Sequence, residues 1–414
     1  MLKTIEKAFN VAMLFYTTGA VLSFVFGSSD GTARDEGSVP YLALQLGLYA
    51  VAFCFIAIRW RLVLRGAMNA KWILALVGIA IASSAWSQDP LFTFRRSLVL
   101  LATTLYAIYF GGRFTITEQL RMLSWTFALV VFSSLFMVIF LPHYGVDHGA
   151  FFGAWQGAFP QKNMLARAMV LAAAVFYFVR PSAVSWIRWI GIAASLVLLA
   201  ASRSVTGVIV LVVMVAALLL FRLARVNVTF VVPLLSGIGT LGIALALLTY
   251  PGQSELFALV GRNTTLTGRT DLWNAALESI LRHPWLGYGF NAFWAGMEGG
   301  SASVILSVGW YVRHSHNGFL DLSLDLGMLG LATFLAGYVV LSKRALQILR
   351  RVPGPGSHWC CAFLCLMLLY NLDESSILMQ NNIFWILYTS TAVNISTYVR
   401  ERRLSKVREL HYEF

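Results

Sequence analysis

Long apolar runs separated by short polar segments extend along the whole chain. A run of about twenty apolar residues can cross the hydrocarbon core of a bilayer as an α-helix. The pattern therefore predicts an all-α integral membrane protein with about twelve transmembrane helices, in a single polytopic membrane domain over residues 1–414. The expected spans are 9–27, 41–58, 72–86, 97–112, 122–141, 163–179, 187–201, 207–221, 228–249, 318–342, 357–371 and 380–397.

One polar segment, residues 251–317, interrupts this pattern and is long enough to fold outside the membrane. Within it, apolar residues recur at helical spacing from Thr270 to Arg282, and Pro284 follows. This spacing predicts an amphipathic helix. We expect the helix to lie flat on the membrane surface, with Trp273 and its leucines toward lipid.

Composition excludes a soluble protein, because the chain is 58% hydrophobic and 12% charged, with a mean hydropathy of +0.73. All but ten of its 31 Lys and Arg residues belong to the two termini and to loops on the same side of the predicted spans. The positive-inside rule then places both termini in the cytoplasm. The net charge of +13 follows from this topology, so we expect no nucleic-acid partner. The first apolar run lacks a cleavage site and should remain as the first span.

Several of the ten remaining basic residues lie where predicted helices begin on the outer side. Arg95 and Arg96 precede the fourth span, Lys162 the sixth and Arg203 the eighth, while Arg269 starts the amphipathic helix. A cation at a helix N-terminus is unfavourable unless an anion binds there, because the helix dipole is already positive. The arrangement suits a phosphate or diphosphate.

Each of these cations has an alternative interpretation. Only one of Arg95 and Arg96 should face the site, and Arg203 could instead reach lipid headgroups. Arg262 could be a solvated loop residue. Lys162 follows several aromatic residues, which could form an interface belt or could stack on sugars.

His316 is the candidate general base, because it precedes a span on this same side and histidine titrates near neutral pH. The secondary candidates are His314, Asn317 and Asp321. We expect no metal, since the H-x-H motif has no carboxylate beside it in the sequence. The acids Asp373 and Glu374 at the outer edge are expected to orient their basic partners.

Six segments resemble the bacterial O-antigen ligase and polysaccharide polymerase superfamily, in order and over most of the chain. They are SSAWSQDPLFTFRRS (83–97), WQGAFPQKN (155–163), SRSVTG (202–207), TGRTDLW (267–273), HPWLGYG (283–289) and HSHNGFLDLSLDLGMLG (314–330). The segment around TLTGRTDLW is most similar to the exopolysaccharide polymerase branch of the succinoglycan type.

The resemblance implies a multi-span glycosyltransferase of the C-type class in the bacterial inner membrane, active at the periplasmic face without metal or other cofactor. The segment 251–317 would be the large periplasmic loop between spans 9 and 10. The donor would be an oligosaccharide on undecaprenyl diphosphate. The resemblance assigns His316 as base and Arg203 and Arg269 to the diphosphate, and Arg95–Arg96 matches the family's arginine pair. The extra His314 departs from the family pattern.

Three functions remain open. A polymerase would join repeat units, an O-antigen ligase would transfer the glycan to a lipid A–core acceptor, and a transporter or flippase would move the glycolipid intact. The expected partners are the lipid-linked donor, a glycan or lipid A–core acceptor, membrane lipids and other polysaccharide assembly proteins. The absence of an internal repeat and the few midplane charges argue against a transporter.

Overall fold

The computed structural model describes residues 2–26, 39–149, 151–179, 186–223, 265–297 and 299–412. Within these ranges the protein is helical and has no β-strand, only an isolated bridge between Val146 and Trp155. The prediction of an all-α protein is therefore confirmed. The helices are α1 (Leu2–Thr18), α2 (Leu22–Phe26), α3 (Val39–Ile58), α4 (Trp60–Asn69), α5 (Lys71–Ala82), η1 (Ser83–Ala85), α6 (Pro90–Arg113), α7 (Ile116–Phe140), α8 (Pro142–Gly145), α9 (Lys162–Phe178), α10 (Trp186–Ala201), α11 (Val205–Leu223), α14 (Thr265–Arg282), α15 (Ser301–Val308), α16 (Gly318–Arg351), α17 (Pro355–Tyr370) and α18 (Ile383–Tyr412).

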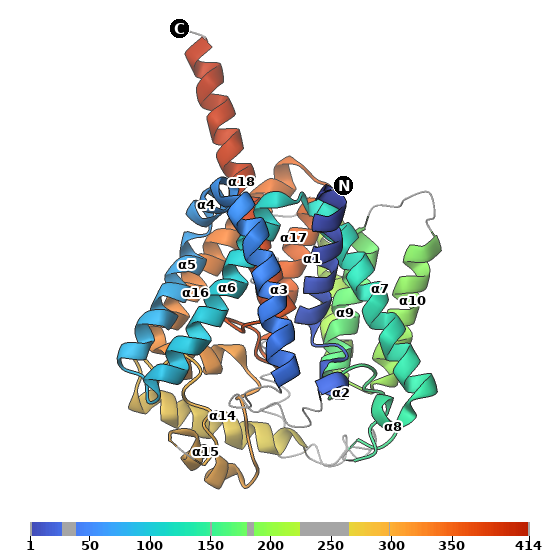
Figure 1. The fold of residues 1–414 in the computed structure, drawn as a ribbon, viewed down its shortest axis with the longest axis vertical. Helices are drawn as coiled ribbons and strands as arrows, with labels where there is room; N and C mark the ends of the chain where they lie inside the picture. Colours follow the sequence, from blue (N-terminus) through green and yellow to red (C-terminus); the bar gives the residue numbers. More distant parts are fainter. Residues whose placement is uncertain are drawn as a thin grey trace.

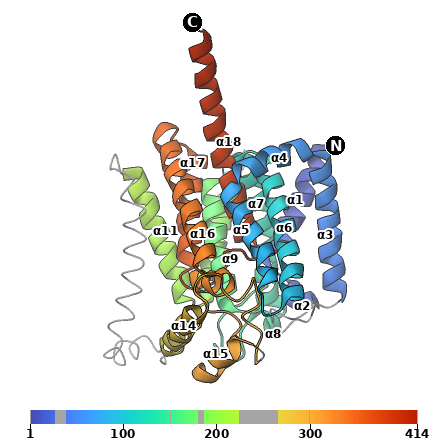
Figure 2. The ribbon, with the colours of Figure 1, turned by 90° about the vertical axis from the view of Figure 1, so that its left-hand side faces the viewer.

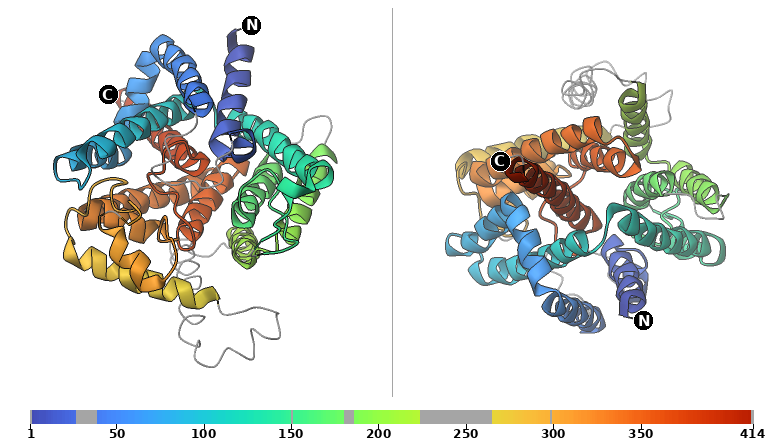
Figure 3. Two further views of the ribbon diagram at one scale, coloured as in Figure 1. Left: turned by 60° about the horizontal axis from the view of Figure 1, so that its bottom comes forward. Right: turned by 90° about the horizontal axis from the view of Figure 1, so that it is seen from above.

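The long helices stand side by side as one bundle (Figure 1). Helix α1 begins and α18 ends at the same end of the bundle, whereas α14 and α15 lie at the opposite end (Figures 1 and 2). Seen end-on, α18 lies among the other helices (Figure 3) and contacts α6, α16, α4 and α17. Its side chains Trp385 and Ile386 are fully buried there.

Four described helices, α3, α6, α7 and α16, are long and apolar enough to cross a membrane, and the pair α4–α5, bent by 92°, would make a fifth. Helices α10, α11 and α17 are apolar but shorter. Helices occupy the positions of the other expected spans as well, with the first broken between α1 and α2. The expected span 228–249 lies outside the described residues.

Helix α6 begins earlier than the hydrophobic pattern predicts. Asp89 caps its N-terminus by accepting a hydrogen bond from the Phe92 amide at 3.1 Å, and Pro90 takes the first position. This is a favourable helix start, because Pro has no amide hydrogen to lose and the carboxylate satisfies a free amide. Arg95 and Arg96 therefore lie inside the helix, and the prediction that they precede it is wrong.

Helix α16 is interrupted at Gly327, where φ is 62° and ψ is −162°. The HPWLGYG segment (283–289) fills the break: the amides of Tyr288 and Gly289 donate to the carbonyls of Leu324 and Asp325 at 2.8 and 3.0 Å. In return, the Met328 amide donates to the Pro284 carbonyl at 2.8 Å. A side chain at residue 327 would collide with this segment, because an added Cβ would lie 2.4 Å from the backbone of Trp285. The motif therefore closes a gap in the helix by satisfying its backbone.

The same segment is also tied to the start of α6. The Tyr288 carbonyl accepts from the Gln88 amide at 3.1 Å, and the Phe290 amide donates to Ser83 Oγ at 3.0 Å. Thr93 Oγ1 then donates to the Phe290 carbonyl at 3.0 Å. These bonds join the motif at 83–97 to the motif at 283–289, so both serve to hold the polar loop on the bundle.

Helix α14 lies across the end of the bundle (Figure 1), and part of the apolar face that was expected to meet lipid packs against protein instead. Leu272 and Ala276 are fully buried, in a hydrophobic cluster with residues of α15 and α16. Leu281, by contrast, is 76% exposed. Apolar spacing locates the buried face of a helix without revealing whether protein or lipid covers it, and here protein covers it.

Candidate active site

The segment 314–317 turns sharply into α16. Asn317 caps that helix, since its Oδ1 accepts from the amides of Phe319 and Leu320 at 3.0 and 3.3 Å. His316 has a φ of 52°, in the left-handed region. That region is uncommon for residues other than glycine and occurs often at functional sites. Asn317 thus has a capping role, and the turn it forms presents His316.

Asp321, in the first turn of α16, holds the segment 314–317 in place through hydrogen bonds. Its Oδ1 accepts from the Ser315 amide and from Trp294 Nε1, both at 2.9 Å, and its Oδ2 accepts from Ser375 Oγ. The carboxylate therefore joins three separate segments, and these donors use three of its roughly four acceptor positions. This supports a structural role for Asp321.

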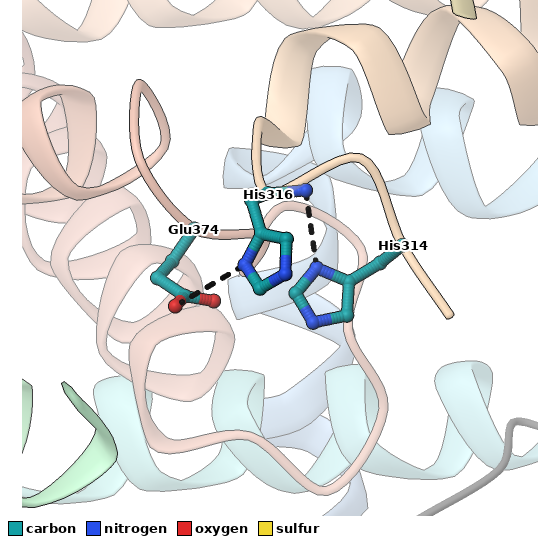
Figure 4. Close-up of side chains that lie close together, drawn as sticks. All are labelled: His314, His316 and Glu374. Carbon is teal, nitrogen blue, oxygen red and sulfur yellow. Dashed lines mark hydrogen bonds and ion pairs between the residues drawn. The ribbon is translucent and has the colours of Figure 1, made fainter. Parts of the chain in front are cut away.

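Glu374, far along the sequence, lies beside His316. The distance from His316 Nδ1 to Glu374 Oε1 is 3.5 Å, and the two side chains are 21% and 15% exposed (Figure 4). Burial by itself raises the pKa of Glu374, but the contact with His316 outweighs burial and lowers this pKa to about 2. A carboxylate that stays ionised favours a proton on Nδ1 of His316, which leaves the lone pair of Nε2 for a substrate.

His314 stands on the other side of His316. Its Nδ1 accepts a hydrogen bond from the His316 amide at 3.2 Å, and the two ring centroids are 4.0 Å apart. Burial and the neighbouring His316 lower the pKa of His314 below its ordinary value. His314 therefore favours the neutral ring, and the backbone hydrogen bond places its proton on Nε2.

These three side chains are also close enough to hold a metal ion, since His314, His316 and Glu374 offer ligand atoms within 4.8 Å of one another. The sequence places no carboxylate next to the H-x-H motif, but folding brings Glu374 there. The bond from the His316 amide takes the Nδ1 lone pair of His314, so a metal at Nε2 would require that ring to change its protonation.

Arg269 forms an ion pair with Asp373, which is the residue before Glu374. Both side chains are largely shielded, at 22% and 16% exposure. Helix α14 begins at Thr265, so Arg269 lies one turn inside the helix and the prediction that it starts the helix is wrong. Trp273, one turn further along α14, donates from Nε1 to the Ser315 carbonyl at 2.9 Å. We call Arg269, Asp373, His316 and Glu374 the acid-paired cluster.

Lys162 and Arg203 make a different set of contacts, and we call them the aromatic-loop pair. Lys162 is the first residue of α9, is buried, and places Nζ 3.7 Å from the ring centroid of Phe151. Arg203 has a φ of 50° and donates from Nη1 to the Phe152 carbonyl at 3.4 Å. The next residue after Arg203, Ser204, donates from Oγ to Asn163 Oδ1 at 3.0 Å. The starts of α9 and α11 are thus joined beneath one aromatic loop.

The other predicted diphosphate ligands are Arg95, Arg96 and Arg262. Arg95 is exposed on α6, and the guanidinium of Arg96 lies 5.1 Å from the ring centroid of Phe92 on the same helix. Arg262 lies outside the described residues.

The sequence does not identify Arg167, a cation near the cluster, as a site residue. Arg167, on α9, is near enough to lower the pKa of both His314 and Glu374. It falls inside an expected span, where its position in the sequence gives little sign of a role.

Comparison with known proteins identifies a matching family model and a relative of this chain. The O-antigen ligase family model matches residues 190–335, a range that contains Arg203, Arg269 and His316. The resemblance to the O-antigen ligase and polysaccharide polymerase superfamily is therefore confirmed. The chain is also 27% identical over 308 residues to the exopolysaccharide production protein ExoQ of Rhizobium meliloti (strain 1021), which covers 69% of this chain and 67% of that protein.

Proposed function

We propose that this protein is a periplasmic-face glycosyltransferase of the bacterial inner membrane that polymerises exopolysaccharide or O-antigen repeat units. It moves a glycan from undecaprenyl diphosphate onto an acceptor sugar. The observation that carries the proposal is the His316–Glu374 contact beside Arg269, because it combines a base, its orienting carboxylate and a cation. The matched family model and the exopolysaccharide-related relative support the substrate class.

The proposed reaction is a single displacement. An acceptor hydroxyl attacks the anomeric carbon, and its proton passes to Nε2 of His316. The bond from the anomeric carbon to the diphosphate oxygen breaks, and its electron pair leaves with the diphosphate. One displacement inverts the configuration at that carbon. Glu374 stabilises the imidazolium that forms, as a carboxylate does for the base in other acyl- and group-transfer enzymes.

Negative charge develops on the diphosphate as it leaves, and nearby cations can stabilise this charge. Arg269 is held by Asp373 beside the base, and its planar guanidinium can bind a phosphate through two parallel hydrogen bonds. Arg203 is the second proposed ligand, from the turn before α11. Fixed cations of this kind stabilise charge that develops in the transition state.

Ligation is the second candidate, because the matched family model is described as an O-antigen ligase. In that reaction the same chemistry transfers the glycan to a lipid A–core sugar. The two functions differ in the acceptor only, so the acid-paired cluster would act identically in both.

The test uses purified protein in nanodiscs with an undecaprenyl-diphosphate oligosaccharide and EDTA. A ladder of longer lipid-linked glycans in the wild type, absent in His316→Ala and Arg269→Ala, would support the polymerase. Transfer only after lipid A–core is added would support the ligase. Intact glycolipid with every acceptor, without release of undecaprenyl diphosphate, would exclude both and favour a transporter.

A further inference from the structure

His314, His316 and Glu374 form a compact group of possible metal ligands (Figure 4). Each side chain offers one ligand atom, and the three atoms lie within 4.8 Å of one another. Among the residues that the structure describes, no other three histidine, cysteine or acidic side chains come together in this way. Two imidazoles and one carboxylate are a ligand set that zinc uses in proteins, with the fourth position left open.

The contact between His316 and Glu374 has the spacing of two metal ligands. Nδ1 of His316 lies 3.5 Å from Oε1 of Glu374, and this nitrogen atom is itself buried without a hydrogen-bond partner among the described residues. Two ligands that each lie about 2.1 Å from one tetrahedral zinc ion are about 3.4 Å apart. A buried polar atom without a hydrogen bond is unfavourable. A metal ion between the two atoms would remove this penalty.

The two segments that carry these ligands are held against each other. Asp321 accepts hydrogen bonds from the Ser315 amide and from Ser375 Oγ, so it joins the segment of the two histidines to the loop of Glu374. Bonds of this kind fix the positions of ligands before a metal binds, and they reduce the ordering that binding would otherwise require.

Two features oppose very tight binding. Nδ1 of His314 accepts a hydrogen bond from the His316 amide at 3.2 Å, so coordination through Nε2 would move the ring proton to Nδ1 and break this bond. The charge of Arg167 also acts on His314 and on Glu374, and it opposes another cation at this place. We therefore expect a metal ion to bind reversibly.

A metal ion on His316 and proton transfer by His316 exclude each other. Coordination through Nε2 would occupy the lone pair that takes the proton of the acceptor. Coordination through Nδ1 would leave the single proton of the neutral ring on Nε2, where it blocks the same lone pair. We propose that His314, His316 and Glu374 form an inhibitory site for a divalent transition-metal ion such as Zn²⁺. This inference rests on the proposed function, because it requires His316 to be the base.

The test measures Zn²⁺ binding to the purified full-length protein in nanodiscs by isothermal titration calorimetry, after EDTA has stripped the protein and has itself been removed. His314→Gln, His316→Ala and Glu374→Gln should each weaken Zn²⁺ binding by more than about a hundredfold, since even residues that only orient ligands contribute roughly tenfold to a hundredfold. Mg²⁺ should not compete, because it prefers oxygen ligands. Melting temperatures identify any variant that fails to fold.

His143→Ala combined with His148→Ala is the matched control. These two histidines are exposed and also lie close together, with 5.8 Å between their ring centroids, but they are not part of a three-ligand group. The double variant should bind Zn²⁺ as tightly as the wild type does. Equal loss of binding in this control would indicate a surface site and overturn the inference.

The second measurement is transfer in the glycan ladder assay. Zn²⁺ at ten times its dissociation constant should leave roughly one eleventh of the wild-type transfer, which is the fraction of protein without metal, and EDTA should restore the rest. Unchanged Zn²⁺ affinity in the three variants, or stimulation of transfer by Zn²⁺, would overturn the inference. Transfer in EDTA without any Zn²⁺ binding would refute the inference alone. Zn²⁺ binding that needs the three side chains, in a protein that transfers to no acceptor, would refute the proposed function and leave only the metal site.

Discussion

The acid-paired cluster and the aromatic-loop pair both present cations that the sequence predicts to bind a diphosphate, but they hold them in different ways. In the cluster, Arg269 and His316 each face a carboxylate, from two consecutive residues of one loop. In the pair, Lys162 lies on an aromatic ring and Arg203 donates to a peptide carbonyl.

The two sets of residues differ in how strictly the orientation of each cation is fixed. A carboxylate fixes the direction of its partner but offsets its positive charge, so it suits residues whose geometry matters to the reaction. A ring contact, such as the one between Lys162 and Phe151, fixes the direction of a cation less strictly than a carboxylate does. We therefore expect the cluster to govern turnover and the pair to govern donor affinity.

The largest effect is expected for the base. His316→Ala should lower transfer by about 10²–10⁴-fold, the usual contribution of a general base, and a glycan ladder assay would measure it. His358→Ala, at the start of α17, is the matched histidine control and should transfer normally. Full activity in His316→Ala would refute the assignment and direct attention to His314.

The next effect tests the pairing of Arg269. Arg269→Ala should lower kcat by about 10²–10³-fold, because a fixed donor to the leaving group is lost. Asp373→Asn keeps the shape but not the charge of the partner, and should lower kcat by roughly tenfold through loss of orientation. An increase in kcat for Asp373→Asn would show instead that the acid only competes with the substrate.

Glu374→Gln should lower kcat by about tenfold to a hundredfold, as expected when a residue that orients a reactive group is replaced. Its KM for the donor should stay close to that of the wild type, since the carboxylate faces the base. A change in KM alone, measured in the same assay, would contradict an orienting role.

A smaller effect is expected for the aromatic-loop pair. Lys162→Met should raise the donor KM by about two- to thirtyfold, the range for one lost cation contact of about 0.5–2 kcal/mol, with kcat nearly unchanged. Steady-state kinetics would distinguish this from the pattern in the cluster. A fall in kcat without a change in KM would remove the contrast between the two regions.

The smallest expected effect is on how the stability of the folded protein depends on pH. The pKa of Glu374 is lowered to about 2 by its neighbours, against an ordinary value of 4.5. Its ionised form therefore stabilises the fold fully above about pH 4.5, and this contribution is lost as the pH falls toward 2. Thermal unfolding of the wild type and of Glu374→Gln should converge over that window. A constant difference between them would contradict the shifted pKa.

Hydrophobic spacing predicts most helices of this fold, because apolar faces of helical period must be covered by something. Hydrophobic spacing predicts the start of α6 too late in the sequence. The helix begins with the capping residues Asp89 and Pro90, which precede the apolar run. The spacing also gives the wrong neighbour for Leu272 and Ala276 of α14, which pack against protein, because periodicity does not distinguish a protein surface from lipid.

The site is less predictable than the fold for a similar reason. His316 and Arg269 can be identified from their motifs, and Asp373 and Glu374 were expected as orienting acids, but no pattern assigns each acid to its partner. Arg167 lies within an apolar stretch, where a single cation has no neighbours in sequence to suggest a ligand. Contacts between distant segments decide these roles, and only the folded chain shows them.

The adjacency of Asp373 and Glu374 has a kinetic consequence. Consecutive Cα atoms stay about 3.8 Å apart, so a backbone shift at one acid also moves the other. A phosphate that binds Arg269 while Asp373 still holds it would shift the loop of these acids and, through one peptide bond, alter how Glu374 holds His316. We therefore expect an ordered sequential reaction, in which the donor must be in place before the base reaches its active orientation and an acceptor is consumed.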